Sequence, residues 1–249
     1  IQSEKMSAIG EVSAKLAHEI LNLLAGIKAA VQLLARSQLQ SQDEGPTAVA
    51  VRDTAQLMSQ EIARVEQLVR RMLTYARPLA PRLEPCEVTR LLAMGCDASR
   101  PACEKANVTL VRKEAVELQQ VIVDPMLVTQ ALSNLLINAA QASSPGGVVT
   151  LSANLTDVEG KRYLALRVAD EGQGIADAVL PNLFQPFYTT KPRGNGLGLA
   201  ISQNIAREHG GLIIAHNRTD RRGAEFALLL PVDPQPPIDP ISRADSASA

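Results

Sequence analysis

His18 has the surroundings of a reactive group. It lies in a stretch whose apolar residues recur every three or four positions, which predicts one long helix over residues 3–37. At about 100° per residue, the apolar stripe of this helix lies opposite His18, so the imidazole faces solvent, where its neutral form is a good nucleophile. Glu19 follows, and Asn22 lies one turn further on the same side. A surface histidine without a function gives the same pattern. Without a second histidine at i+4, the stretch is not a zinc-protease motif.

A stripe of neutral amides runs along a second expected helix, residues 124–143, which opens with Asp124 as N-cap and Pro125 at the first helical position. The stripe consists of Gln130, Asn134, Asn138 and Gln141. Amide carbonyl oxygens can bind Mg²⁺, which keeps several waters and bridges to phosphates. A plain solvated helix face explains the stripe equally well.

Asp170 ends an expected strand and begins a glycine-rich turn in which Gly172, Gly174 and Ile175 follow. A carboxylate at a strand end can accept a hydrogen bond from an exocyclic amine such as that of adenine. Glycines let the backbone approach a ligand closely. The alternative is a tight turn closed by an Asx contact.

A second glycine run opens an expected helix over residues 196–209, where the backbone amides of a helix N-terminus can bind phosphate. Its residues are Gly194, Gly196, Leu197, Gly198 and Leu199. A loop of roughly twenty residues between the two runs is typical of a lid or binding loop. This loop contains Phe184, Phe187, Thr190 and Lys191.

The elements that must present His18 are two helices. A second helix over residues 47–76 has apolar residues in strict four-three alternation, the pattern of a helical bundle. The expected seam is Ile9, Val12, Leu16, Ile20, Leu23, Ile27, Val31 and Leu34 in the first helix and Val51, Ala55, Met58, Ile62, Val65, Val69 and Met72 in the second. Two such helices form an antiparallel hairpin with too little core to be stable alone, so we expect two copies to form a four-helix bundle.

The chain after the hairpin has a different composition. We assign residues 1–77 to the hairpin, 78–87 with its prolines to a linker, 88–231 to a mixed α+β domain, and 232–249 to a disordered tail. The expected helices of the α+β domain are 88–105, 124–143 and 196–209. Its expected strands are 107–112, 119–123, 147–155, 162–169, 211–216 and 224–230.

Composition excludes several classes of protein. Lys and Arg number 25 and Asp and Glu 26, a formal net charge of -1, which argues against a nucleic-acid binder. No apolar run approaches the about 18–20 residues of a membrane helix. The three cysteines, Cys86, Cys96 and Cys103, fit reduced cytosolic thiols better than a disulfide scaffold. Ile1 stands inside an expected helix, so we expect a fragment. A membrane anchor in a missing N-terminal part stays open.

These motifs together resemble those of bacterial two-component sensor histidine kinases, over residues 3–231. The segment Lys5 to Leu34 is similar to the family's H box, Asn134–Ala142 to its N box, Asp170–Ile175 to its first glycine box, Phe184–Phe187 to its F box, Gly194–Leu199 to its second glycine box, and Gly223–Phe226 with Leu230-Pro231 to its closing strand. The long lid is most similar to nitrogen-regulator-like members.

The resemblance implies a fold class and a reaction. The fold is an all-α antiparallel hairpin forming a dimeric four-helix bundle, followed by an α+β ATP-binding domain of the α/β sandwich type. His18 accepts a phosphoryl group from ATP, with Glu19 as the base. Asn138 coordinates Mg²⁺, Asn134 supports it, and Gln141 lies near the phosphates.

The resemblance also implies how ATP is bound. Asp170 binds the adenine amine, and Gly172 and Gly174 make room for the ring. Lys191 and the backbone amides from Gly196 to Leu199 hold the phosphates. The implied nucleotide-binding set is completed by Ile175, Thr190 and Gly194.

The implied partner is the receiver domain of a response regulator, whose aspartate receives the phosphoryl group from His18. Asn22 lies where the family places a residue able to orient water, which favours phosphatase activity. The chain departs from the family at Leu21, where a basic residue is usual, and at Leu23, where a proline usually bends the helix. We expect a cytoplasmic homodimer that makes no nucleic-acid contact and, within this fragment, no membrane contact.

Two other classes of function stay open. One is a nucleotide-driven clamp that phosphorylates no histidine, and the other is a scaffold that binds regulators without catalysis. The histidine on its own hairpin argues against the clamp, and the intact Asn138, Asp170 and glycine boxes argue against the scaffold. We expect structural roles for the remaining histidines: His209 as a helix C-terminal residue favoured by the helix dipole, and His216 at a strand end.

Overall fold

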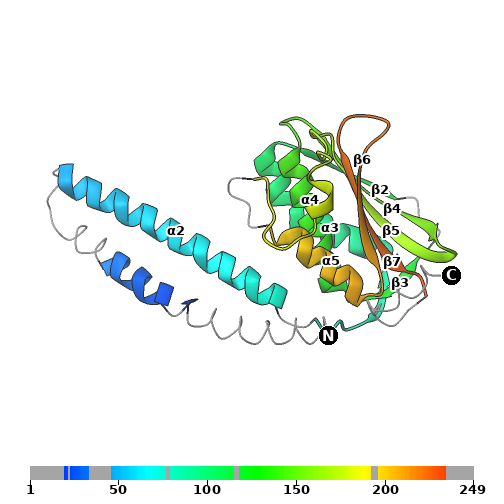
Figure 1. Ribbon diagram of the computed structural model, residues 1–249, viewed down its shortest axis with the longest axis horizontal. Helices are drawn as coiled ribbons and strands as arrows, with labels where there is room; N and C mark the ends of the chain where they lie inside the picture. Colours follow the sequence, from blue (N-terminus) through cyan, green and yellow to red (C-terminus); the bar gives the residue numbers. More distant parts are fainter. Residues whose placement is uncertain are drawn as a thin grey trace. The chain divides into compact units, whose positions relative to one another are not determined.

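The structure is a computed structural model of the 249-residue chain, and it describes residues 20–21, 23–33, 46–76, 79–114, 118–191 and 196–233. The chain divides into two compact units, residues 1–78 and 79–249 (Figure 1). The expected order, a helical hairpin followed by a mixed α and β domain, is confirmed. In the described residues, no helix is long and apolar enough to span a membrane.

The first unit is an antiparallel pair of helices. Residues 23–33 are helical, and α2 (Pro46–Ala76) is the second helix. The ammonium group of Lys28 lies 3.2 Å from a carboxylate oxygen of Glu66. An apolar cluster of Val31, Ala55 and Ile62, with Leu24 packed against it, joins the two helices.

The expected seam is correct only in part within one chain. In α2, Ala55, Ile62 and Val69 are buried at seven-residue spacing, whereas Met58 is 50% exposed. In the first helix Leu24 packs against the cluster and Leu23 is 69% exposed. The reason is that a hairpin buries one stripe of each helix. The other apolar stripe faces away, where Ile20, Leu23, Ile27, Met58 and Val65 are exposed.

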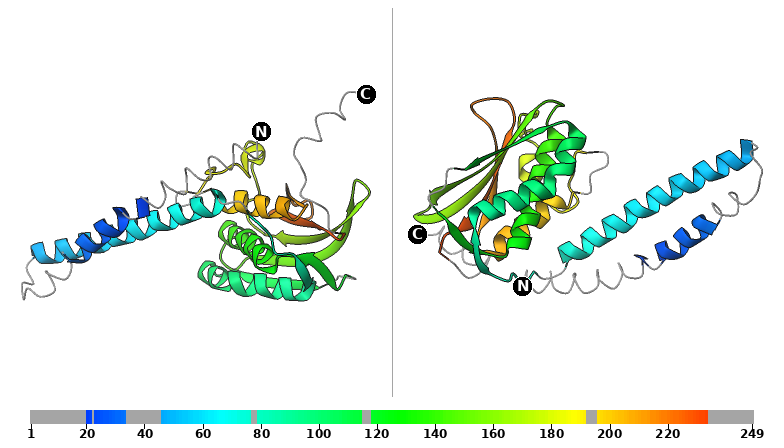
Figure 2. Two further views of the ribbon diagram at one scale, coloured as in Figure 1. Left: turned by 90° about the horizontal axis from the view of Figure 1, so that it is seen from below. Right: turned by 180° about the vertical axis from the view of Figure 1, so that it is seen from behind.

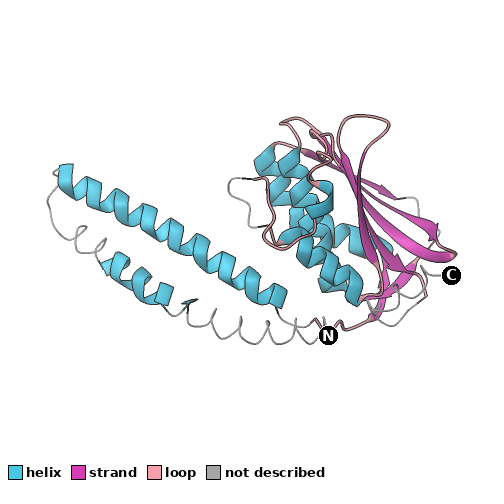
Figure 3. Ribbon diagram, viewed as in Figure 1, coloured by secondary structure: helices cyan, strands magenta, loops and turns pink. Residues whose placement is uncertain are grey.

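The second unit has two layers, a five-stranded sheet and three helices. The sheet order is β2-β4-β5-β7-β6, with β2 parallel to β4 and the other pairs antiparallel. Its strands are β2 (Thr109–Glu114), β4 (Val148–Val158), β5 (Lys161–Ala169), β6 (Leu212–Asn217) and β7 (Ala224–Pro231). The helices α3 (Val88–Ala106), α4 (Pro125–Ala142) and α5 (Gly198–Glu208) cover one face of the sheet (Figures 2 and 3).

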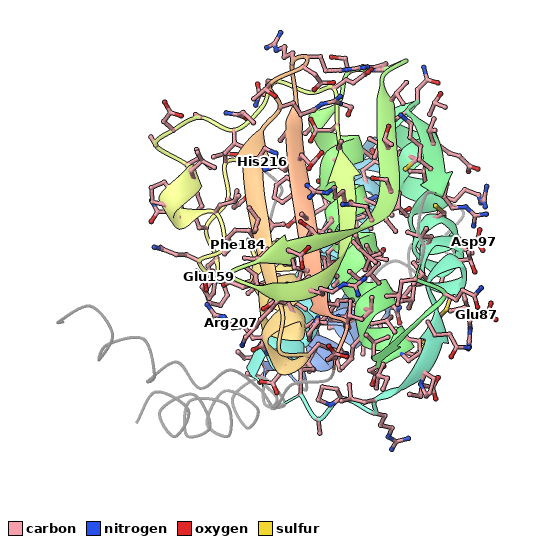
Figure 4. The ribbon with its side chains drawn as sticks, turned by 90° about the vertical axis from the view of Figure 1, so that its right-hand side faces the viewer. Glu87, Asp97, Glu159, Phe184, Arg207 and His216 are labelled. Carbon is pink, nitrogen blue, oxygen red and sulfur yellow. The ribbon has the colours of Figure 1, made fainter. Side chains whose placement is uncertain are left out.

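The core lies between these two layers. It contains the side chains that α4 and the central strands turn toward each other, including Leu132, Leu135, Leu164, Leu166 and Leu228, all fully buried. The opposite face of the sheet carries a polar row in which Arg167 bonds Asn154 and Glu225. Figure 4 labels His216 on β6; its Nε2 lies 3.8 Å from a Glu225 carboxylate oxygen. His216 therefore belongs to the surface of the sheet, in line with its expected structural role.

Asp124 connects three segments at the start of α4. Its Oδ1 accepts hydrogen bonds from the N–H groups of Met126 and Leu127, as expected of an N-cap, and its Oδ2 accepts one from the N–H of Arg82. Burial raises the pKa of the carboxyl, but these backbone donors outweigh burial and hold the pKa below its usual range. The Asp124 side chain thereby holds the first turn of α4 next to the segment that contains Arg82.

His209 differs from its expected role. It is the C-cap of α5, but its ring is buried: Nδ1 lies 2.8 Å from the carbonyl oxygen of Ile205, and Nε2 accepts a hydrogen bond from the N–H of Asp124. A carbonyl oxygen only accepts and a backbone N–H only donates, so this geometry selects the neutral Nδ1–H ring. The ring joins α5 to α4 as a neutral group rather than as a cation favoured by the helix dipole.

One strand and its pairing were not expected. β1 (Glu84–Glu87) lies within the stretch 78–87 that we expected to be a linker, and it pairs antiparallel with β3 (Gln120–Val123). A short 3-10 helix, Leu180–Asn182, lies in the loop before the second glycine run. The cysteines Cys86, Cys96 and Cys103 are free, and burial raises the pKa of all three thiols, as befits packing residues.

Candidate nucleotide site

Amide oxygens of α4 and a lysine of the lid loop meet at one point. The Nζ atom of Lys191 donates hydrogen bonds to Oδ1 of Asn138, at 2.5 Å, and to Oε1 of Gln141, at 2.9 Å. Asn138 and Gln141 lie almost one turn apart on α4, which places both side chains on the same side of the helix. The structure therefore brings together three residues that the sequence expected at the metal and phosphates.

Lys191 is a partly desolvated cation. Burial lowers the pKa of its ammonium group, and the negative charge of Asp170 acts in the opposite direction. Its two amide partners carry no charge, so the ammonium group stays without a compensating anion among them. A cation in this position can bind a phosphate group.

Asn134 positions the helix that follows the lid. Its Nδ2 donates to the carbonyl oxygen of Gly198, at 3.2 Å, and to Oγ of Ser202, at 3.3 Å. Ser202 also donates to the carbonyl oxygen of Gly198 and is fully buried. Asn134 therefore ties α4 to the first turn of α5, a role that includes Ser202, which the sequence reasoning missed.

The second glycine run forms the start of α5. Leu197 is its N-cap and has an aliphatic side chain, so no side-chain oxygen caps the first turn. Gly198 and Leu199 begin the helix, whose N-terminal amides favour an anion. Gly196 has a φ of +64°, and a Cβ there would collide with the backbone of Phe187 and Tyr188, so only glycine fits.

The lid loop reaches the second glycine run through the backbone. The N–H of Phe187 donates to the carbonyl oxygen of Gly196 at 2.9 Å. Phe187 has a φ of +67°, an uncommon conformation for a bulky residue, and the residue is 58% exposed. Thr190 is exposed next to Lys191, and Figure 4 labels Phe184 on this loop.

Asp170 is the buried carboxylate of the site, with 1% of its surface exposed. Its Oδ1 accepts hydrogen bonds from the N–H of Gly172, at 2.8 Å, and of Ala224, at 3.1 Å. The first of these is the Asx contact that the sequence left as an alternative, so the turn and the carboxylate site coexist. Since both bonds end on Oδ1, Oδ2 is the oxygen that can serve a ligand.

The glycines of this box serve the protein backbone. A Cβ on Gly172 would collide with the carbonyl oxygen of Ala142, the last residue of α4. Gly174 has a φ of +81°, and a Cβ there would lie 2.7 Å from Oδ1 of Asn217. Gly172 thus makes room for the end of α4, and its expected place beside the adenine ring stays a prediction. Ile175, which follows, is half-buried.

Some expected site residues lie outside the described residues: His18, Glu19, Asn22 and Gly194. The structure adds residues that the sequence reasoning missed, Ser202, Asn217 and Arg218. Asn217 and Arg218 follow an expected strand, where polar loop residues are common, but no local signal shows that they contact the box at Asp170.

Two family models match the chain in succession. The model described as "His Kinase A (phospho-acceptor) domain" matches residues 8–81, and the one described as "Histidine kinase-, DNA gyrase B-, and HSP90-like ATPase" matches residues 123–234. Sensor histidine kinase ZraS of Escherichia coli O157:H7 is 32% identical over 234 residues, which are 93% of this chain and 48% of ZraS. The chain belongs to the sensor histidine kinase family. It spans about half the length of this relative.

Solved histidine kinases share the fold. Full-length ShkA in complex with AMPPNP superimposes with a TM-score of 0.71 at 24% identity, covering 92% of this chain and 47% of ShkA. Histidine kinase ThkA, in complex with the response regulator protein TrrA, gives a TM-score of 0.61 at 24% identity, covering 93% of this chain and 64% of ThkA. The architecture of this histidine kinase chain is therefore that of its family over both units.

Proposed function

We propose that this chain phosphorylates its own His18 from ATP and passes the phosphoryl group to an aspartate of a response regulator. The observation that carries the proposal is the order of the two family matches, a phospho-acceptor domain followed by an ATPase domain on one chain. The ATPase domain also offers polar groups for both ends of the nucleotide: Lys191 with Asn138 for the phosphates, and Asp170 for the adenine.

The proposed reaction at His18 is a nucleophilic displacement. The unprotonated ring nitrogen attacks the γ-phosphorus of ATP, the bond from that phosphorus to the β–γ bridging oxygen breaks, and ADP leaves. The phosphorylated ring then holds one proton too many. Glu19, the next residue, takes this proton as a general base.

The chain's own residues divide the work of holding ATP. Oδ2 of Asp170 accepts a hydrogen bond from the adenine amine, and the amides at the start of α5 with Lys191 bind the phosphates. The family implies Mg²⁺, and the donor set fits a cation, because Oδ1 of Asn138 and Oε1 of Gln141 converge on one cationic atom. Asn138 would hold the ion, which offsets the charge of the transferring group.

The role of Lys191 gives a testable result. Replacing Lys191 with Met removes the ammonium group and keeps the aliphatic stem. We expect ADP binding in EDTA to weaken strongly, because no cation then faces the phosphates, and binding with Mg²⁺ to weaken less. Calorimetric titrations with and without Mg²⁺ measure both. The control is Lys105→Met, which makes the same charge change on the exposed side of α3. Equal losses of ADP affinity with Mg²⁺ and in EDTA would mean that the Lys191 ammonium group does not take the place of the metal at the phosphates.

Labelling separates the proposed kinase from the alternatives. The chain is incubated with γ-labelled ATP and Mg²⁺, and the protein-bound label is tested for acid lability, the signature of phosphohistidine. Acid-labile label supports the kinase. ATP turnover without label supports a nucleotide-driven clamp, and the absence of both supports a scaffold.

We also propose a homodimer, formed through the apolar stripe that the hairpin leaves exposed. Met58→Lys is expected to shift the protein from dimer to monomer, because the lysine is solvated in a single hairpin and buried without a partner in a dimer. Sedimentation velocity measures the change. Gln60→Lys, an exposed position that is not on the stripe, should leave the dimer intact. Ile62→Asp, at a position only 7% exposed, should unfold the hairpin itself.

Two further parts of the proposal rest on the family. The partner is the receiver domain of a response regulator; the solved ThkA complex contains the response regulator protein TrrA. Asn22, one turn beyond His18, would orient water for hydrolysis of the regulator's phospho-aspartate. Because ATP is the phosphoryl donor, we place this part of the protein in the cytoplasm.

A further inference from the structure

The end of β6 and the loop that follows it contact both ends of the first glycine box, residues 170–175. Two consecutive residues make these contacts: Asn217, the last residue of β6, bonds Ile175, and Arg218 bonds Asp170. None of the expected site residues lies in this loop. Asn217 and Arg218 are therefore additional to the groups already assigned to ATP, two of which they contact.

Asn217 pairs with Ile175 as a neighbouring strand would. Its Oδ1 accepts a hydrogen bond from the N–H of Ile175 at 2.6 Å, and its Nδ2 donates to the carbonyl oxygen of Ile175 at 2.8 Å. One side-chain amide thus satisfies both backbone groups of a residue. The residue before Ile175 is Gly174, whose φ of +81° and missing Cβ allow Oδ1 of Asn217 to come close.

Arg218 acts at the other end of the box. Its Nη1 donates to the carbonyl oxygen of Asp170 at 3.1 Å, and the same guanidinium bonds both carboxylate oxygens of Asp220. Asp220 therefore holds the guanidinium plane in place, and this contact lowers the pKa of the Asp220 carboxyl. Gly223 packs so closely on the Asp170 carbonyl that a Cβ there would collide with it.

We propose that Asn217 is a positioning residue for the adenine end of the nucleotide. The inference rests on the proposed function, since it assigns the box to adenine. Asp170 is fixed by Arg218 and by two backbone donors, whereas Gly174 and Ile175 depend on the Asn217 amide. Without this amide, the backbone of Gly174 is free to rotate. The Gly174–Ile175 backbone, which we place beside the purine, then loses its fixed position. Because Asn217 is itself exposed, its loss leaves the packed core intact. We therefore expect nucleotide binding to weaken while the fold is kept.

The test is Asn217→Ala in the whole chain, with Asn217→Asp as a second variant of equal size. The aspartate keeps the acceptor for the Ile175 N–H and loses the donor to its carbonyl oxygen. Thr219→Ala, an exposed change in the same loop, is the control. We measure ADP affinity by calorimetry, the thermal unfolding midpoint, and KM and kcat for labelling of His18.

We expect Asn217→Ala to weaken ADP binding and raise KM by about tenfold, the effect of losing two net hydrogen bonds, with kcat unchanged at saturating ATP. Asn217→Asp is expected to follow in the same direction, and Thr219→Ala to match the unsubstituted chain. Unchanged ADP affinity in a folded Asn217 variant would overturn the inference, as would a loss of kcat and thermal stability with KM unchanged. Failure of the unsubstituted chain to bind ADP would instead overturn the proposed function.

Discussion

His18→Gln is expected to abolish acid-labile labelling from γ-labelled ATP while ADP affinity stays the same. Glutamine is neutral and of similar length, but its amide nitrogen has no nucleophilic lone pair, so no phosphoryl group can be transferred to it. ADP affinity is preserved because the nucleotide residues belong to the other compact unit of the chain. Labelling with acid hydrolysis and calorimetry with ADP measure the two results.

The matched control for this change is His216→Gln. His216 is half-exposed on β6, where its Nε2 lies 3.8 Å from a carboxylate oxygen of Glu225, and it should be replaceable without loss of label. Acid-labile phosphate on the His18 variant would assign the acceptor to another histidine. A simultaneous loss of ADP binding would mean that the two units are not independent, contrary to the proposal.

Local patterns were enough to predict most of the fold. The Asp124-Pro125 pair correctly predicted the start of α4, because an N-cap bonds amides only two and three residues away. β1 was missed because its partner strand β3 lies more than thirty residues later and its four residues carry no alternation of their own. Leu23, expected on the seam, is exposed within one chain, because apolar residues that recur every three or four positions do not tell which of two neighbouring stripes packs inside the hairpin.

For the site too, the sequence predicted local features, whereas the contacts between distant residues could not be predicted. The sequence identified groups by type and position, such as the amides of α4 and the lysine of the lid, and the structure brings Lys191 to Asn138 across 53 residues. The supporting contacts were beyond sequence reasoning: Asn217 reaches Ile175 across 42 residues, and Asn134 reaches Ser202 across 68. Such contacts depend on which strands and helices become neighbours, and no local period encodes that.

Asp170→Asn is expected to reverse the purine preference of the site. In the unsubstituted chain Oδ1 accepts the N–H groups of Gly172 and Ala224, which leaves Oδ2 for the adenine amine. Asparagine keeps one oxygen for the two backbone donors, and this fixes its amide so that the NH₂ group replaces Oδ2. A donor then faces the donor amine of adenine, and ATP affinity should fall about ten- to a hundredfold.

Inosine triphosphate separates this explanation from a general loss of binding, because it carries a carbonyl oxygen where ATP carries the amine. The NH₂ group of the asparagine can donate to that oxygen, whereas the carboxylate of Asp170 repels it. Asp170→Asn should therefore bind inosine triphosphate better than the unsubstituted chain does. Asp177→Asn, which removes the same charge from an exposed position in the same loop, should change neither affinity. Equal losses for both nucleotides would place Asp170 away from the purine amine and reduce it to a turn residue.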